Sequence, residues 1–217
     1  MISSDTNLFA LPEGVMGEPT NEERIALQDA LLSAIGAGRV DRVRELLASG
    51  ADANVRSGEG ATALMHAAHG GNLPLVRALL AAGADVGATD PSGWTALTKA
   101  VYNADHDRGF ADVVQALIDA GASVETPIGY GIRPLMLAAG YGETAVVETL
   151  LGAGADVLAR NAGGLTALMM VKEKFYVDVI NLLYEAEQKA GVGEGNCTTK
   201  HPPGSSVITF RKPPPRS

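Results

Sequence analysis

Apolar residues recur along the central part of the chain with the spacing of short helices that bury one side. Leu75, Val76, Leu79 and Leu80 follow an i, i+1, i+4, i+5 pattern, which places them on one face of a helix. Just before them, residues 64–68 form a second apolar stretch that contains two alanines. Because alanine is small, that stretch permits close neighbours. The pattern predicts pairs of short helices separated by turns.

Two short strings of residues recur along the chain in a common register. Gly-Ala-Asp begins at Gly50, Gly83 and Gly154, and Gly121 begins the variant Gly-Ala-Ser. The second string runs from a glycine to a leucine, at residues 60–64, 93–97, 131–135 and 164–168. Both strings recur at intervals of 33, 38 and 33 residues, so they share the same five-residue excess. This agreement indicates one structural unit repeated in line.

Each string has a physical role in such a unit. Thr62, Thr95 and Thr166 stand where a hydroxyl accepts a hydrogen bond from the first turn of a helix. Gly83 follows the second helix of its unit, and glycine ends a helix easily because it adopts the left-handed conformation. The residues between Gly83 and the next threonine then form a turn or hairpin.

The unit resembles the ankyrin repeat, about 33 residues of turn, helix, loop and helix. The likeness covers residues 26–184, although Thr62-Ala63-Leu64-Met65 stands where the family has threonine-proline-leucine-histidine. The resemblance implies an all-α solenoid of helix-turn-helix units with short β-turn or hairpin connections, about five units including caps. We expect an ankyrin domain at 21–190, with a cap at 22–56, repeats at 57–89, 90–127 and 128–160, and a cap at 161–190. Flexible segments at 1–20 and 191–217 would flank it.

Composition and charge exclude several classes of protein. The chain has 217 residues, of which 46% are apolar, with a net charge of −8; this disfavours disorder and nucleic-acid binding. No apolar stretch is long enough to span a membrane, and the first residues do not resemble a secretory signal. The single cysteine, Cys197, excludes an internal disulfide. We therefore expect a cytoplasmic protein, and the Ala/Gly-rich usage favours a bacterial source.

Residues with catalytic or metal-binding chemistry are sparse. No nucleophile-elbow, phosphate-loop or zinc-protease string is present. His106 lies between Asp105 and Asp107 in the five-residue insertion at 104–108, which fits either a divalent-metal site or, more simply, a solvated acidic loop. We predict no enzymatic activity, no cofactor and no metal. A metal-dependent enzyme using His69 and His106 remains a remote alternative.

The resemblance assigns partner contacts to the turn tips and first-helix faces, which line one concave groove in this family. Carried over repeat by repeat, these positions are Arg56, Glu59 and His69; Thr89, Trp94, Tyr102 and Asn103; Tyr130, Ile132 and Tyr141; and Arg160, Leu165, Glu173 and Lys174. The insertion adds Asp105, His106 and Asp107 beside them.

Four of these positions are aromatic, namely Trp94, Tyr102, Tyr130 and Tyr141. Tyrosine and tryptophan are typical of interface hot spots because they bury a large area at low entropic cost. Alternatively, some of them pack between neighbouring turns. With Asp112, the acidic insertion favours a basic patch on the partner.

Residues 191–217 are rich in proline and carry a net charge of +3. The run Val207–Phe210 resembles a short strand that adds to a partner or folds back on the acidic second repeat; a disordered tail is the simpler alternative. We predict a non-catalytic module that binds one protein partner through the groove, as an inhibitor, immunity or accessory protein of an enzyme. A homo-oligomeric adaptor that uses the basic tail is the alternative, although we do not favour oligomerisation.

Overall fold

Helices follow one another in pairs along the chain. The computed structural model describes residues 20–102 and 110–191. Within these ranges it contains α1 (Asn21–Gly36), α2 (Val40–Ala48), α3 (Ala63–His69), α4 (Leu73–Ala81), α5 (Ala96–Val101), α6 (Ala111–Asp119), α7 (Pro134–Tyr141), α8 (Thr144–Gly152), α9 (Ala167–Val171) and α10 (Val177–Lys189), with a short 3₁₀ turn, η1 (Gly129–Gly131). Apart from Thr20 and Gly191, the predicted flexible segments lie outside these residues, as does the insertion at 104–108.

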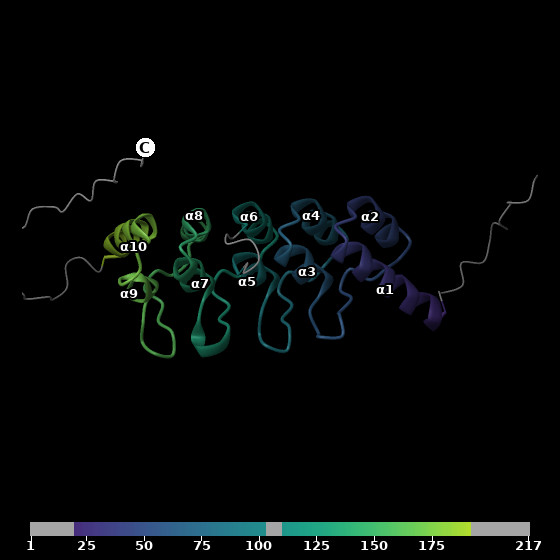
Figure 1. Cartoon of the computed structure of the whole chain (residues 1–217), viewed down its shortest axis with the longest axis horizontal. Helices are drawn as coiled ribbons and strands as arrows, with labels where there is room; N and C mark the ends of the chain where they lie inside the picture. The colour runs from purple at the N-terminus through teal and green to yellow at the C-terminus, as the bar shows by residue number, and fades with distance from the viewer. Residues whose placement is uncertain (1–19, 103–109, 192–217) are drawn as a thin grey trace, which may run out of the picture.

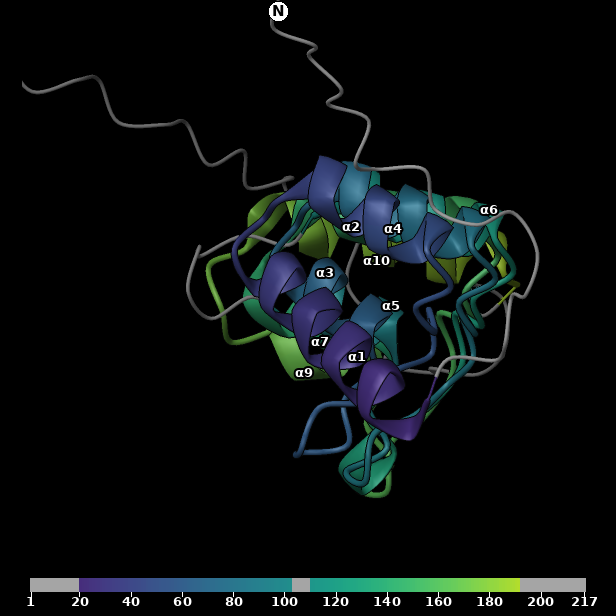
Figure 2. The same cartoon turned by 90° about the vertical axis from the view of Figure 1, so that its right-hand side faces the viewer.

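The helix pairs stack into an elongated body of two layers. Figure 1 shows the odd-numbered helices in one row and the even-numbered helices in the other, with the turns that precede α3, α5, α7 and α9 projecting from the first row. Figure 2, along the stack, shows the same two layers end on. Each helix contacts its partner in the pair and the equivalent helix of the next unit. The stack is the predicted all-α solenoid.

Small residues let the helices of the first layer approach one another closely. Ala67, Ala68, Ala138 and Ala139 are almost completely buried where α3 and α7 contact their neighbours. Leucine and valine from the second layer complete the core, for example Leu79 at 0% exposure. The core therefore runs through all units, so each unit depends on its neighbours to bury its apolar side.

The recurring glycine, alanine and aspartate build the turn between units. Gly83 has a φ of +84° and ends α4, while the Asp85 carboxylate accepts a hydrogen bond from the Gly87 amide at 2.9 Å. Asp156 makes the same turn. In the variant string Ser123 replaces the aspartate, and its hydroxyl accepts from the Glu125 amide instead. The recurrence thus reflects one local hydrogen-bond pattern.

The predicted threonine caps are confirmed. The Thr62, Thr95 and Thr166 hydroxyls accept hydrogen bonds from the backbone amides three residues later, at 3.2–3.3 Å. Arg133 takes this position in the third repeat and makes no such bond; there Pro134 begins α7, where its missing amide costs nothing. The predicted turn or hairpin connections are, in the described ranges, turns with isolated bridges, such as that between Arg56 and Thr62.

Polar side chains join successive turns across the unit boundaries. Asn54 donates to the Gly83 carbonyl and accepts from the Asp85 amide. Further along the stack, Glu125 accepts from the Asp156 amide at 2.8 Å and forms an ion pair with Arg133 at 3.0 Å. These contacts fix each turn relative to the next, so the row of turn tips is held as one surface.

Candidate partner-binding surface

Three aromatic side chains from neighbouring repeats form a continuous row. The ring of Trp94 lies 5.2 Å from that of Tyr102, with an interplanar angle of 57°. The ring of Tyr102 in turn meets that of Tyr141 edge-on at 5.5 Å. Trp94 precedes the N-cap of α5, Tyr102 follows its last residue, and Tyr141 is the last residue of α7. We call these three residues the aromatic row.

The aromatic row becomes more exposed toward the third repeat. Trp94 and Tyr102 are half-buried; their rings pack on each other within one repeat, and Tyr102 also contacts Tyr141 of the next. Tyr141 keeps 50% of its surface exposed. Partial burial and the neighbouring Tyr102 phenol raise the pKa of Tyr141. The row thus has a more buried end at Trp94 and an open end at Tyr141.

A largely buried ion pair lies beside the more buried end of the row. Lys99 Nζ is 3.1 Å from Asp90 Oδ2 and 5.0 Å from the centroid of the Trp94 ring. The other Asp90 oxygen accepts hydrogen bonds from the Ser92 and Trp94 amides. Burial alone would raise the pKa of Asp90, but these hydrogen bonds and the Lys99 charge outweigh it and lower that pKa. Trp94 is therefore held by its backbone and by its ring.

A cavity opens beside Tyr141, between α7 and α9. It has a volume of about 290 Å³ and is lined by Ile132, Met136, Leu137, Gly140, Tyr141, Met170 and Lys174. Lys174 Nζ donates to the Gly140 carbonyl at 2.6 Å, which closes one side of the cavity. Met169 and Leu165 lie on the same end unit and are 44% and 43% exposed. Apolar surface therefore continues from the aromatic row onto the last unit.

The turn tip of the third repeat presents a second exposed aromatic. Tyr130 is 89% exposed and has a φ of +61°, a conformation that non-glycine residues seldom adopt. Its carbonyl accepts a hydrogen bond from the Ala162 amide in the next turn at 2.9 Å, which holds the strained backbone. Arg160, in that neighbouring turn, is exposed and donates to the Gly164 carbonyl. The ring contacts of the aromatic row do not extend to Tyr130.

The contact positions expected in the first units are not joined to the aromatic row. Arg56 donates to the carbonyls of Gly60 and Thr89 at 2.8 and 2.9 Å, so it links two turn tips. Glu59 is exposed at its tip, and His69 is half-buried at the end of α3. At the other end Glu173 is exposed beyond α9. Asn103, Asp105, His106 and Asp107 lie outside the described residues.

Sequence reasoning missed several residues that complete this surface. Lys99 lies over the Trp94 ring and Met170 lines the cavity, but neither is among the contact positions that the resemblance assigns. Tyr176 packs on Gly142, where an added Cβ would lie 2.8 Å from its ring. The equivalent position in an earlier repeat could have indicated this role for Tyr176. Phe110 also precedes the second helix of its unit, and it packs on Gly71 as Tyr176 packs on Gly142.

Titratable side chains do not gather into a metal site in the described ranges. No group of three or more histidine, cysteine, aspartate or glutamate residues there has the geometry to hold a metal ion. His66 lies on α3 near Glu59 and His69. Burial lowers its pKa, His69 and Lys99 lower it further, and Glu59 opposes them.

Comparison with known proteins agrees with the repeat architecture. Within residues 20–102 and 110–191, no helix is both long and apolar enough to cross a membrane. No curated protein shows significant similarity to the chain. The family described as ankyrin repeats (three copies) matches residues 31–128 and 108–194, which together are more than half of the 217 residues. The chain therefore belongs to the ankyrin repeat family, whose members generally mediate protein–protein interactions and are typically non-catalytic.

Proposed function

We propose that this protein binds one protein partner through the face formed by its first helices and turn tips, centred on the aromatic row. The continuous contact from Trp94 through Tyr102 to the half-exposed Tyr141 carries this proposal. Tyrosine and tryptophan dominate interface energetics where they are rigid and centrally placed. Because each ring is already packed against the next, little side-chain entropy is lost on binding.

The cavity beside Tyr141 adds a place for an apolar side chain of the partner. Its lining is mostly apolar, and Met170 provides an adaptable wall. The exposed Met169 and Leu165 extend the apolar area onto the last unit. An apolar anchor inserted here, with Tyr141 closing over it, would exclude water from the centre of the interface.

Charge at this end of the surface favours an acidic segment of the partner. Lys172 and Lys174 are exposed beyond α9, with Glu173 between them, and Arg160 is exposed at the adjacent turn. Of the acidic edge that favours a basic partner patch, Asp105 and Asp107 lie outside the described residues, and Asp112 is exposed in the first turn of α6. The first observation favours an acidic partner and the second favours a basic one. Replacing Lys172 and Lys174 by glutamate weakens capture of an acidic partner and strengthens capture of a basic one.

Affinity capture from the native lysate tests the proposal. Full-length tagged protein is compared with the double variant Tyr102→Ala/Tyr141→Ala, and captured proteins are identified by mass spectrometry. Tyr184→Ala is the matched control, because Tyr184 is a 57% exposed tyrosine on α10 in the other layer. A hot-spot tyrosine contributes about 2 kcal/mol or more, so the double variant loses the partner while the control retains it.

Two further measurements keep the test decisive. Circular dichroism and thermal melting establish that the double variant remains folded, and Tyr141→Phe keeps the ring while it removes the hydroxyl. Equal capture by folded wild type and double variant contradicts the proposal. If the captured partner is an enzyme, its activity with and without this protein distinguishes an inhibitor or immunity protein from an accessory factor.

A further inference from the structure

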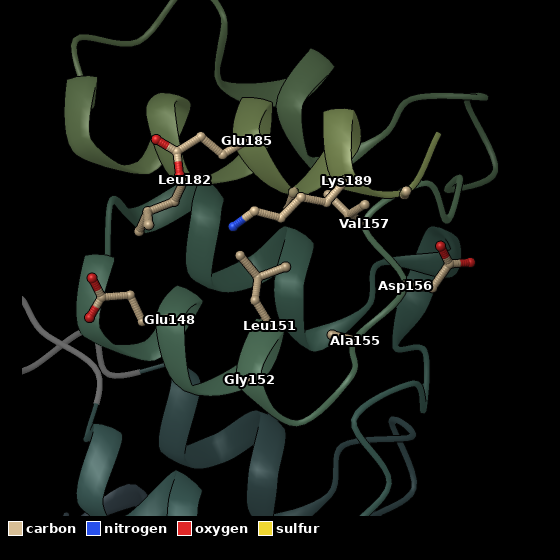
Figure 3. A pocket seen from close by; sticks show the side chains of 11 residues that line it. Glu148, Leu151, Gly152, Ala155, Asp156, Val157, Leu182, Glu185 and Lys189 are labelled. Atoms are coloured by element: carbon tan, nitrogen blue, oxygen red, sulfur yellow. The ribbon is translucent and has the colours of Figure 1, made fainter. Parts of the chain in front are cut away.

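A second groove lies on the opposite layer, between α8 and α10. Figure 3 shows it lined by Leu151 and Gly152 from α8 and by Leu182, Glu185 and Lys189 from α10, with the Ala155–Val157 turn at one end. Its volume is about 520 Å³, within the roughly 300–1,000 Å³ typical of ligand-binding pockets. None of the aromatic row lines it, so it is independent of the proposed partner-binding face.

The groove forms because the second helix of the last unit is longer than the equivalent helices of the earlier units. α4, α6 and α8 are each nine residues long, whereas α10 has thirteen. The Gly-Ala-Asp string that ends the earlier helices is missing from the last unit. α10 therefore continues past the level where α8 stops, and its last turn forms a wall opposite Ala155 and Val157.

The groove combines an apolar floor with carboxylates that have no ion-pair partner in the described ranges. Leu151, Leu182 and Val157 line the floor, while Glu148 and Glu185 stand at the same edge in Figure 3. Neither glutamate forms a salt bridge with a described residue. The charged residues that line the groove are Glu148, Asp156 and Glu185 against Lys189, a net charge of −2. The chemistry that fits is an apolar side chain followed by cationic ones.

The chain itself contains such a segment a short distance along the sequence. Phe210 ends the apolar run Val207–Phe210 and is followed at once by Arg211 and Lys212. Residues 192–217 carry four basic residues against one acidic residue, a net charge of +3. Ala190 lines the groove, so the chain leaves α10 at its edge. Fully extended, residues 192–206 span about 50 Å at roughly 3.5 Å per residue. This length is more than enough for Phe210 to reach back to the groove.

We propose that Phe210 and the two basic residues after it occupy the α8–α10 groove of their own chain. Phe210 would lie on Leu151 and Leu182, with Arg211 and Lys212 beside Glu148 and Glu185. A short tether gives an effective concentration in the millimolar range, so even a weak contact is populated.

Leucine-methyl NMR on the full-length protein tests this contact. Phe210→Ala shifts the methyl signals of Leu151 and Leu182 but leaves those of Leu47, which lines the shallower groove between α2 and α4. Phe9→Ala is the control, because it removes an aromatic from the other terminal segment outside the described residues. In 0.5 M salt the wild-type signals move toward those of Phe210→Ala, because the screening length falls to a few ångströms.

Charge reversal supplies the second arm. Glu148→Lys/Glu185→Lys releases the segment, as does Arg211→Glu/Lys212→Glu. Combining the four substitutions restores the contact, so that Phe210→Ala again shifts the Leu182 signal as it does in the wild-type protein. Shifts that vanish on dilution would place the segment in a second copy of the protein and overturn the intramolecular contact. Identical Leu151 and Leu182 signals in wild type and Phe210→Ala would overturn the proposal altogether.

Discussion

The rings of Tyr102 and Tyr141 meet edge-on at 5.5 Å, across the boundary between the second and third repeats. The contact joins the end of α5 to the end of α7, so two units present a single aromatic surface. Edge-to-face rings contribute about 0.5–1.5 kcal/mol beyond the area they bury. The pair therefore links the stability of the stack to the shape of the proposed binding face.

The Tyr102–Tyr141 contact has a spectroscopic signature. Burial and the Tyr102 phenol raise the pKa of Tyr141, so Tyr141 ionises above the ordinary value of about 10. Because folding raises this pKa, the protonated phenol of Tyr141 contributes to the free energy of unfolding below about pH 10. The contribution is lost as pH rises through the folded-state pKa. Tyr102→Phe lowers the pKa of Tyr141 in a tyrosine-ring NMR titration, whereas Tyr184→Phe leaves it unchanged. An unaltered Tyr141 titration in Tyr102→Phe would refute the coupling.

Gly142 is required for both its backbone conformation and its contact with Tyr176. Its φ is +78°, and an added Cβ would lie 2.8 Å from the Tyr176 ring. Gly154 has a similar φ of +85° but open space around it. Gly154→Ala therefore costs about 1–2 kcal/mol for the left-handed backbone alone, and Gly142→Ala costs about 1–3 kcal/mol more for the overlap. Urea unfolding of the two variants measures the difference, and equal midpoints would contradict it.

Asp90 organises the turn that carries Trp94. It receives two backbone hydrogen bonds and the Lys99 ion pair, so Asp90→Ala is expected to lower the free energy of unfolding by about 1–3 kcal/mol. Because the pKa of Asp90 is lowered, its contribution is present above about pH 4 and is lost as pH falls through the folded-state pKa. Chemical unfolding of wild type and Asp90→Ala between about pH 2 and 7 should converge at the acidic end. Asp119→Ala, at an exposed end of α6, is the control.

His66 should titrate below an ordinary histidine. Burial lowers its pKa, His69 and Lys99 act in the same direction, and Glu59 opposes them. Histidine NMR titration then gives a His66 pKa below about 6.5, lower still in Glu59→Gln and higher in Lys99→Met. Because the folded state disfavours the protonated form of His66, the free energy of unfolding is highest above about pH 6.5. It decreases as pH falls through the folded-state pKa. A Glu59→Gln variant with a higher pKa would show that the charges around His66 are arranged differently.

Local features of the stack were predictable because they repeat. The threonine caps, the glycine stops and the alanine-rich first helices follow from short-range hydrogen bonding and helix periodicity, which neighbouring residues decide. The connections were predicted only as turns or hairpins, and the structure builds them as turns with isolated bridges. Arg56, a predicted contact position, also joins two turns in the structure, because its carbonyl acceptors come from successive units.

The repeating unit, its helices and the order in which they stack follow from the amino-acid sequence, because they depend on spacing and caps within about 33 residues. The packing of the stack establishes which side chains meet between units. It placed Tyr102 against Tyr141 and Tyr176 on Gly142. It also created the α8–α10 groove by letting α10 continue past its neighbour. Those contacts depend on the offset between stacked helices, a distance in space that no interval along the chain specifies.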